Sequence, residues 1–265
     1  MKLLKINNYI IPDIHYKDGI HEDDRIKEIY RNGELIWSVF ESAVFEFSAK
    51  NDFQTFIVPN FCTHIDIDMA AAKGYGSTGG GGRVQCRMTV HGGQILYVWA
   101  GIVPTANNNS TYNASDIRTD NTGKLDTTSL QSRLVTAGGA GSQRGGTGGA
   151  GGNPNGSSGG NNGKGTGGGG ATQSKGGGAG SGTVFPSSGA AGKFGLGGQS
   201  TGGAGGAGWY GGGSGGSGSY GDTQYGGGGG GSSYCNPDYC TDIIYTGGYN
   251  KGPGYVKITT LRITE

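Results

Sequence analysis

The sequence predicts an all-β protein, in which a β sandwich is interrupted by a long glycine-rich insertion. Apolar and polar residues alternate with period two along several short segments, which is the pattern of strands with one buried face. We find no amphipathic helical pattern of useful length. Glycine accounts for 62 of the 265 residues, and about half of residues 138–231 are glycine.

The bulk composition limits the classes of function. The chain carries 20 basic and 19 acidic residues, a net charge of +1, so it lacks the basic footprint of a nucleic-acid-binding protein. An RGG-type RNA-binding segment needs many arginines, and only Arg144-Gly145-Gly146 fits that pattern. There is no run of roughly 18 apolar residues, so we expect no membrane insertion. Residues 1–8 are too short and polar for the apolar part of a signal peptide, so we expect synthesis in the cytoplasm without an export signal.

Residues 1–41 are predicted to be a separate attachment segment. Apolar residues flank Asn32-Gly33, a pair that favours a type I′ turn, so residues 26–37 are expected to form a β-hairpin. Residues 13–24 are polar and are expected to form a loop. A lone hairpin is marginally stable in water, so this segment is expected to pack on the rest of the chain or on a partner.

Residues 42–137 and 232–265 are predicted to form the β sandwich. Alternation, or a short apolar run bounded by turn residues, predicts strands at 44–47, 53–59, 63–70, 83–90, 95–100, 134–137, 242–245 and 255–263. Residues 105–130 are rich in Asn, Ser, Thr and Asp and are expected to be a loop. Because strands precede and follow the glycine tract, residues 138–231 are an insertion that is anchored at both ends.

The glycine-rich insertion has a period of three, with Gly-Gly-X triplets in residues 145–152, 202–208 and 212–218. Three residues per turn is the repeat of the extended polyproline-II-type helix, which has no internal hydrogen bonds. Its backbone groups need partners, so we expect polyglycine-II helices that bond to one another in a bundle clamped by the sandwich. A flexible linker is the alternative, although an unstructured loop of this length inside a domain is uncommon.

The cysteines and histidines do not have the spacing of a metal site. Cys62 and Cys86 lie in segments with strand-like patterns and are expected to be small buried apolar residues. Cys235 and Cys240 bracket four residues and are the candidates for a disulfide. The four histidines are scattered along the chain, so we expect neither a metal nor another cofactor.

Several blocks of sequence resemble one known family. The blocks are residues 53–59, 81–84, 93–98, 114–118, 133–139, 208–213, 229–234 and 252–258, in that order. They resemble the glycine-rich domain found in the extracellular region of the anaplastic lymphoma kinase receptor and in bacterial and phage proteins. The resemblance covers roughly residues 44–260 and implies a jelly-roll-like β sandwich that carries an inserted polyglycine-II helix bundle. Where the family usually has Trp-Gly-Ala after a strand, this chain has Ala70-Ala71-Ala72, and the resemblance extends to no kinase domain or membrane anchor.

The N-terminal segment resembles a different group. The pattern Ile-Tyr-x-Asn-Gly-x-x-Ile-Trp at residues 29–37 is similar to short attachment segments of phage tail proteins, including those of phages that infect Bacteroidetes. The distal tail-fibre adhesins of T-even-like phages also use glycine-helix bundles, whose tip loops bind host receptors, which is an analogy of architecture. These resemblances imply a virion protein that attaches to other virion or tail proteins through Ile29, Tyr30, Ile36 and Trp37.

Receptor binding is the function that these patterns favour. No convergent set of nucleophile, base and metal ligands is recognisable, so no catalytic residue and no enzyme activity are expected, and Asp116 and Arg118 are expected to form a structural ion pair. Aromatic residues that interrupt the glycine runs are the natural contacts, because aromatic side chains are enriched in binding hot spots. The receptor-binding candidates are Phe185, Phe194, Trp209, Tyr210, Tyr220 and Tyr225, with Tyr234 and Tyr239 beside them. Packing within the protein is the favoured role of Trp209, Tyr210 and Tyr234, whereas Phe185 and Phe194 are expected at loop tips.

The expected partners are a host surface glycan or outer-membrane protein at one end and other virion proteins at the other, with a homo-oligomer left open. Two alternatives stand beside the adhesin. One is a purely structural virion protein, such as a fibre, cap or decoration subunit. The other is a bacterial surface matrix protein, which the lack of a signal peptide disfavours.

Overall fold

The computed structural model describes residues 3–6, 9–15, 28–31, 34–38, 42–106, 109, 112–183, 188–218 and 224–262. The chain divides into two compact units, Met1–Glu41 and Ser42–Glu265. Nearly all of the regular structure in the described residues is β, which confirms the all-β prediction.

The first unit contains two small antiparallel sheets. Strands β3 (Glu28–Arg31) and β4 (Glu34–Ser38) pair as the predicted hairpin, with Ile29 opposite Trp37; Tyr30 lies in β3 and Ile36 in β4. The predicted turn type at residues 32–33 lies outside the described residues. Strands β1 (Leu3–Ile6) and β2 (Tyr9–His15) form the second pair. Because β2 runs to His15, the prediction that residues 13–15 belong to a loop is wrong.

The second unit contains two five-stranded antiparallel sheets, in the orders β12-β11-β10-β9-β6 and β13-β8-β7-β14-β5. The strands are β5 (Val44–Ser48), β6 (Gln54–Ile57), β7 (His64–Ala70), β8 (Gly81–Thr89), β9 (Ile95–Trp99), β10 (Ser115–Arg118), β11 (Arg133–Ala137), β12 (Tyr234–Cys235), β13 (Cys240–Asn250) and β14 (Tyr255–Leu261). Each sheet combines strands from before and after the glycine tract. The tract is therefore an insertion within one folded unit.

Period-two alternation gives each sheet one buried face. In β7, Ile65, Ile67 and Met69 are at most 2 % exposed, while the polar side chains between them are half-buried. The buried faces of the two sheets meet, because the ring of Phe45 in β5 lies 5.1 Å from that of Phe56 in β6, edge to face. Burying one such aliphatic or aromatic side chain stabilises the fold by roughly 1.5–3 kcal/mol, so these alternating residues form the core of the sandwich.

Residues 105–130 are not simply the loop that their polar composition predicted. Strand β10 crosses the middle of its sheet, and all four of its residues are buried, including Asp116 and Arg118. The short helix α1 (Thr127–Gln131) follows, and the Asp126 side chain caps it by accepting hydrogen bonds from two backbone amides. The sequence pattern missed β10 because charged residues stand at positions where a buried strand normally has apolar ones.

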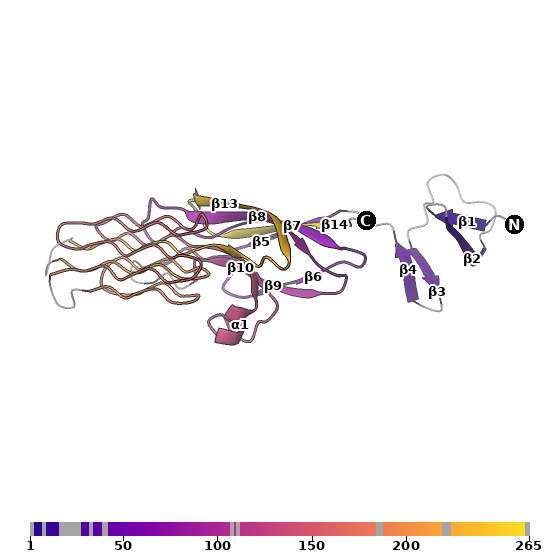
Figure 1. Ribbon diagram of the computed structural model, residues 1–265, viewed down its shortest axis with the longest axis horizontal. Helices are drawn as coiled ribbons and strands as arrows, with labels where there is room; N and C mark the ends of the chain where they lie inside the picture. Colours follow the sequence, from indigo (N-terminus) through magenta and orange to yellow (C-terminus); the bar gives the residue numbers. More distant parts are fainter. Residues whose placement is uncertain are drawn as a thin grey trace. The chain divides into compact units, whose positions relative to one another are not determined.

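The glycine tract runs back and forth beside itself and extends from one end of the sandwich (Figure 1). Its described residues contain ten extended segments, which lie at 138–142, 146–152, 156–161, 166–171, 176–182, 189–192, 197–199, 202–208, 211–218 and 224–233. Four turns lie near the sandwich, at residues 153–155, 172–175, 193–196 and 209–210. The connections at residues 143–145, 162–165 and 200–201, which are fully described, lie at the opposite, distal end, so the segments that they join run in opposite directions.

Hydrogen bonds around the last segment, 224–233, follow a period of three. The backbone amides of residues 226, 227 and 228 donate to three different segments, at the carbonyls of Gly216, Gly160 and Ser142. The amides of residues 229, 230 and 231 return to the same three segments in the same order. Carbonyls of this segment accept from three further segments, 146–152, 166–171 and 202–208. The segment therefore has six bonded neighbours.

The segment 211–218 is a second centre of the same kind. The amides of residues 211, 212 and 213 donate to Lys193 at the end of the segment 189–192, to the segment 202–208 and to the segment 166–171. The amides of residues 214, 215 and 216 return to the same three segments in the same order, so the period is again three. The two centres bond to each other and share the segments 166–171 and 202–208 as neighbours. Each centre is one of the six neighbours of the other, two outer segments touch both centres, and three more touch each centre alone. The two centres and these eight outer segments make up all ten segments of the tract, which therefore forms one complete hexagonal layer around both centres.

Neighbouring backbone leaves no room for a side chain at most positions of these centres. A Cβ atom on Gly229 would lie 2.0 Å from the carbonyl oxygen of Gly169, and one on Gly213 would lie 1.9 Å from that of Gly178. The restriction is absent at Gly178, an exposed residue of an outer segment, where a Cβ atom would meet nothing within 4 Å. Close approach of backbones, at distances that only glycine allows, explains the glycine content of the central segments.

Candidate functional site

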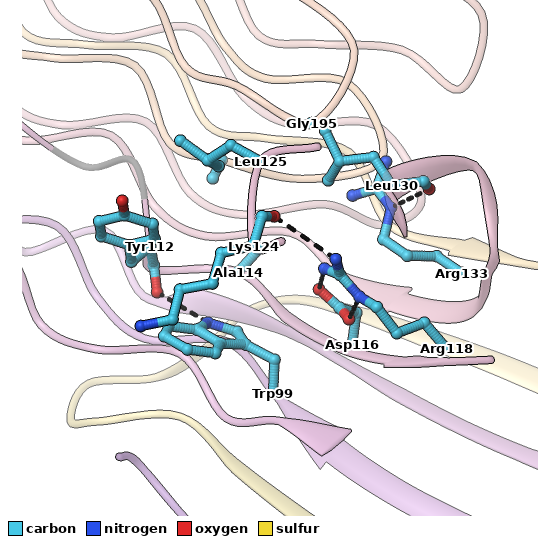
Figure 2. Close-up of a pocket in the computed structure, with 11 residues that line it drawn as sticks. Trp99, Tyr112, Ala114, Asp116, Arg118, Lys124, Leu125, Leu130, Arg133 and Gly195 are labelled. Carbon is cyan, nitrogen blue, oxygen red and sulfur yellow. Dashed lines mark hydrogen bonds and ion pairs between the residues drawn. The ribbon is translucent and has the colours of Figure 1, made fainter. Parts of the chain in front are cut away.

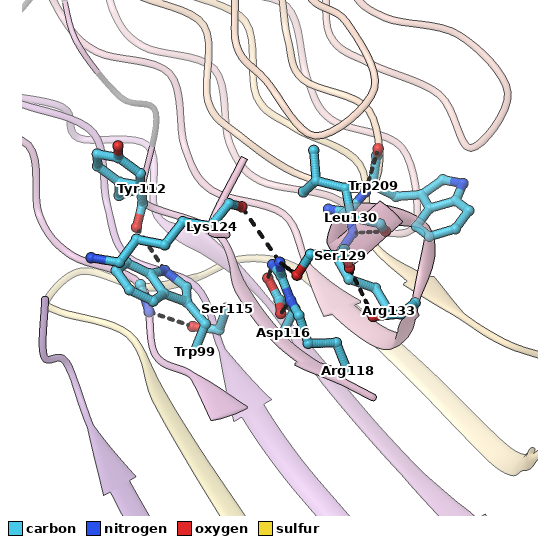
Figure 3. A network of polar contacts seen from close by, with 12 residues as sticks. Trp99, Tyr112, Ser115, Asp116, Arg118, Lys124, Ser129, Leu130, Arg133 and Trp209 are labelled. Atoms are coloured by element: carbon cyan, nitrogen blue, oxygen red, sulfur yellow. Dashed lines mark hydrogen bonds and ion pairs between the residues drawn. The ribbon is translucent and has the colours of Figure 1, made fainter. Parts of the chain in front are cut away.

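A buried arginine joins the sandwich to the base of the glycine bundle (Figure 3). Arg133, the first residue of β11, is 2 % exposed. Its Nε donates to the carbonyl of Leu130 at 2.8 Å, and its Nη1 and Nη2 donate to the carbonyls of Gly208 and Trp209 at 2.8 and 3.1 Å. Burial lowers the pKa of Arg133 to about 10, so the guanidinium stays protonated at neutral pH. One cation thus ties α1, β11 and the bundle together.

An aromatic cluster surrounds this guanidinium, which lies 4.8 Å from the ring centre of Phe194 and 4.9 Å from that of Trp209. The Phe194 ring meets the rings of Trp209 and Tyr210 edge to face at 4.9 and 5.4 Å, and Trp209 stacks on Tyr234 at 3.9 Å. A desolvated cation–π contact stabilises by about 2 kcal/mol. The cluster therefore fixes two of the turns of the bundle, 193–196 and 209–210, against the sandwich.

The predicted ion pair between Asp116 and Arg118 is present and buried (Figure 3). Two nitrogens of the Arg118 guanidinium, Nε and Nη2, each lie 2.6 Å from a carboxylate oxygen of Asp116. The remaining nitrogen, Nη1, donates to Ser129 Oγ at 3.1 Å, and the Phe53 ring centre lies 4.9 Å from the guanidinium carbon. All of these partners are structural, so the pair anchors α1 onto β10.

A small cavity lies between β9, β10, α1 and the base of the bundle (Figure 2). Its volume is about 20 Å³, which is room for about one water molecule. Lys124 lies over the Trp99 ring at 4.7 Å from the ring centre, and its Nζ donates to the carbonyl of Asn51 at 2.6 Å. The cavity is therefore a packing feature of the base and is too small for a substrate.

Asn113 is the second side chain that ties the sandwich to the bundle, and it is fully buried. Its Nδ2 donates to the carbonyl of Ala140 at 2.7 Å, and its Oδ1 accepts from the amide of Ala207 at 2.9 Å. Its own carbonyl accepts from the amide of Ala72 in the sandwich at 2.8 Å. Asn113 thus connects the first outgoing segment, a returning segment and the sandwich.

No protein-family model matches the chain, and no curated protein matches it. The resemblance to the glycine-rich domain family therefore stays a prediction. Among the residues that the structure describes, no helix combines the length and the apolar character needed to cross a membrane. The case for a function depends on the side chains themselves, above all on those at the distal end of the bundle.

The distal end gathers polar side chains from turns that are far apart in sequence. The Arg144 guanidinium lies 4.2 Å from the centre of the Tyr225 ring and donates from Nη1 to the carbonyl of Thr201. The side chain of Gln224 accepts from the backbone amide of Lys164 at 3.4 Å. Lys164 is exposed, whereas Arg144 and Tyr225 are half-buried. The distal turns thus form one connected surface that carries two basic residues and a tyrosine.

The structure places the aromatic candidates at opposite ends of the bundle. Trp209 and Tyr210 pack in the cluster around Arg133, next to the sandwich, and Tyr225 lies at the distal end. The expectation that Phe194 occupies a loop tip is wrong, because its ring completes the cluster at the base. Phe185 and Tyr220 lie outside the described residues.

Sequence reasoning did not single out Arg144, Lys164 or Arg133 as functional. Arg144 and Lys164 stand in short interruptions of the glycine runs, so a search for charged residues as well as aromatic ones would have found them. Arg133 had no such signal. Its role depends on the carbonyls of Gly208 and Trp209, at the start of the turn 209–210, which lie far away in the sequence and close in space.

Cys235 and Cys240, the disulfide candidates, are free thiols in the structure, and Cys86 lies beside them as a third. Hydrogen bonds from Cys235 and Cys86 lower the pKa of Cys240 to about 4. The interaction with Cys240 raises the pKa of Cys235 to about 12, and interactions with both partners raise that of Cys86. Cys62 is buried elsewhere, in a turn after β6 instead of a strand, and its Sγ donates to the carbonyl of His64 at 3.1 Å.

Proposed function

We propose that the chain is a phage virion adhesin, which binds a host cell-surface receptor through the distal turns of a rigid glycine bundle. One observation carries the proposal. Two central segments, each bonded to six neighbours with a period of three, hold the distal turns at a set distance from the sandwich. The central segments carry only glycine and serine from residue 211 to residue 218, whereas larger polar side chains collect at the distal turns. A stiff support whose distal end carries several kinds of side chain suits a protein that presents a binding surface to a receptor.

We further propose that the extended segments are polyglycine-II helices and that the sandwich is jelly-roll-like, as the family resemblance implies. The period of three in the hydrogen bonds supports this assignment, because a polyglycine-II helix has three residues per turn and no internal hydrogen bonds. Such a helix is stable where neighbouring helices supply hydrogen-bond partners for its backbone N–H and C=O groups.

The proposed receptor is a host surface glycan or an outer-membrane protein, and the first unit attaches the chain to other virion proteins. Two-stranded sheets are marginally stable alone, which supports a role for Ile29, Tyr30, Ile36 and Trp37 in docking on a partner. A purely structural virion subunit is the alternative, and the following experiment separates the two.

Virions that carry the double variant Lys164→Ala/Tyr225→Ala are expected to adsorb to their host at least about tenfold more slowly than the parent virions. Both residues lie at the distal end, and truncating a binding hot spot costs about 2 kcal/mol or more. The measurement is the adsorption rate constant, taken on particles whose content of this chain has been checked by gel electrophoresis.

The matched control is Lys175→Ala/Lys193→Ala, which removes two exposed lysines from turns at the sandwich end of the same bundle. This variant is expected to adsorb like the parent. Unchanged adsorption in both variants, with normal particle assembly, would favour the structural subunit over the adhesin.

A further inference from the structure

Three thiols from three strands converge at one edge of the sandwich. Cys86 lies in β8, Cys235 in β12 and Cys240 at the start of β13. Their sulfur atoms all lie within 4.8 Å of one another, and each residue is at most 5 % exposed. Strand β12 belongs to one sheet, and β8 and β13 belong to the other, so the three sulfurs bridge the two sheets.

The turn between Cys235 and Cys240 is held by its own backbone. The amides of Tyr239 and Cys240 both donate to the carbonyl of Asn236, at 3.2 and 3.0 Å, and the Asn236 side chain accepts from the amide of Asp238. The amide of Asn236 donates to the carbonyl of Leu134 in the neighbouring strand. Backbone hydrogen bonds therefore hold the sulfurs of Cys235 and Cys240 near each other without a disulfide or a metal ion.

We propose that Cys86, Cys235 and Cys240 bind a thiophilic d¹⁰ cation, of which Zn²⁺ is the one to test, and that the ion clamps the two sheets where the glycine bundle returns to the sandwich. In a tetrahedral zinc–thiolate site the Zn–S distance is about 2.3 Å, which places neighbouring sulfurs about 3.8 Å apart. The three sulfurs need to move by no more than about 1 Å to reach that geometry.

The fourth ligand position falls to a small oxygen ligand, either water or a nearby hydroxyl. The Tyr245 hydroxyl interacts with the Cys235 thiol and is one side-chain candidate. A disulfide between Cys235 and Cys240 is the competing chemistry. It uses two sulfurs and leaves Cys86 buried beside them, whereas a metal ion uses all three, which is why the geometry points to the ion.

The clamp has a definite place in the fold. Strand β12 continues directly from the central segment 224–233, and β13 starts five residues after β12 ends. An ion at the three sulfurs would therefore fasten the end of that central segment to β8 in the opposite sheet. Metal binding to a folded site stabilises the folded state by mass action, so removal of the ion is expected to lower the melting temperature.

The experiment uses the full chain, purified under reducing conditions and titrated with Co²⁺ as a spectroscopic probe and then with Zn²⁺. One Co²⁺ per chain is expected, with a thiolate-to-cobalt charge-transfer band and the visible bands of tetrahedral cobalt, both lost on adding Zn²⁺. X-ray absorption on the zinc form is expected to count about three sulfur ligands at about 2.3 Å. Cys240→Ser is expected to weaken Co²⁺ binding at least about tenfold, because removing a direct ligand costs no less than removing a residue that only supports a ligand, which costs about 10–100-fold.

The matched control is Cys62→Ser, which removes the buried thiol that lies outside the cluster and is expected to leave the cobalt spectrum unchanged. Three results would overturn the proposal. They are a reduced chain that binds no Co²⁺, a zinc site with two or fewer sulfur ligands, and a Cys235–Cys240 disulfide found by mass spectrometry in protein that binds no Co²⁺ after reduction. The X-ray absorption measurement uses the parent chain, so it decides the question even if Cys240→Ser does not fold.

Discussion

Replacing Gly229 by alanine is expected to destabilise the second unit by at least about 3 kcal/mol or to prevent it from folding. The added Cβ atom would lie 2.0 Å from the carbonyl oxygen and 2.4 Å from the carbonyl carbon of Gly169. These are backbone atoms, which cannot rotate away as a side chain can. Adding one methyl group to a packed core costs about 1–3 kcal/mol, and here the neighbouring segment must move, which disturbs its bonds to the centre.

The matched control for this prediction is Gly178→Ala in the same tract. A Cβ atom at Gly178 would meet nothing within 4 Å, and the residue is exposed. The control is expected to be neutral, or to gain up to about 1 kcal/mol because alanine restricts the unfolded chain. Thermal unfolding followed by circular dichroism measures both variants, and about 3 kcal/mol corresponds to roughly 6–12 °C for a unit of this size. Equal melting temperatures for the two variants would contradict the packed array.

Replacing Arg133 by methionine is expected to destabilise the second unit by about 3 kcal/mol. Methionine fills a similar volume but leaves the buried carbonyls of Leu130 and Gly208 without their donor. The carbonyl of Trp209 loses one of its two donors and keeps the backbone amide of Gly195. An unsatisfied buried acceptor costs about 1–3 kcal/mol, and the cation–π contacts with Phe194 and Trp209 are lost as well. Relief from burying a charge offsets part of this loss. Urea-induced unfolding of the parent and variant chains measures the difference.

The control for this variant is Arg87→Met on the outer face of β8. Arg87 pairs with the carboxylate of Asp66 at 2.8 Å, and the two side chains are 36 % and 43 % exposed. An exposed ion pair contributes about 0–1 kcal/mol, so this change is expected to be nearly neutral. A loss of less than about 1 kcal/mol in Arg133→Met would show that the base of the bundle does not depend on the buried cation. Hydrogen exchange at the amides of residues 208–211 would then be expected to stay as slow as in the parent chain.

The elements that could be predicted from the sequence are those with a local repeat in their residues. Alternation predicted β5 to β8 and β14, because one face of each strand is less exposed than the other, and a short apolar run predicted β9. The period of three in the glycine tract matches the period of the hydrogen bonds around the segments 211–218 and 224–233. A local repeat determines how often a segment bonds to the same neighbouring segment. It does not determine which segment that neighbour is, so the positions of 211–218 and 224–233 at the centre of the bundle could not be predicted.

The features that sequence reasoning missed all depend on long-range contacts. Strand β10 is buried because α1 and the Arg118 ion pair cover its outer face, which its charged residues concealed. Phe194 stands in an irregular stretch that resembles a loop tip, and only the cluster around Arg133 shows that it packs at the base. Cys86 precedes Cys235 by some 150 residues, and the two lie in strands of different sheets, so their meeting depends on how the two sheets pack.

The place where the tract leaves the sandwich limits which insertions of sequence the bundle can accept. Gly138, which opens the first segment, donates its amide to the Oγ of Ser233, which closes the last, so departure and return lie side by side. A path that starts and finishes at the same end must contain an even number of passes. Insertions that preserve the base are therefore restricted to complete out-and-back hairpins at the perimeter, and each new hairpin adds one more turn at the far end, where new sequence meets the fewest packing constraints.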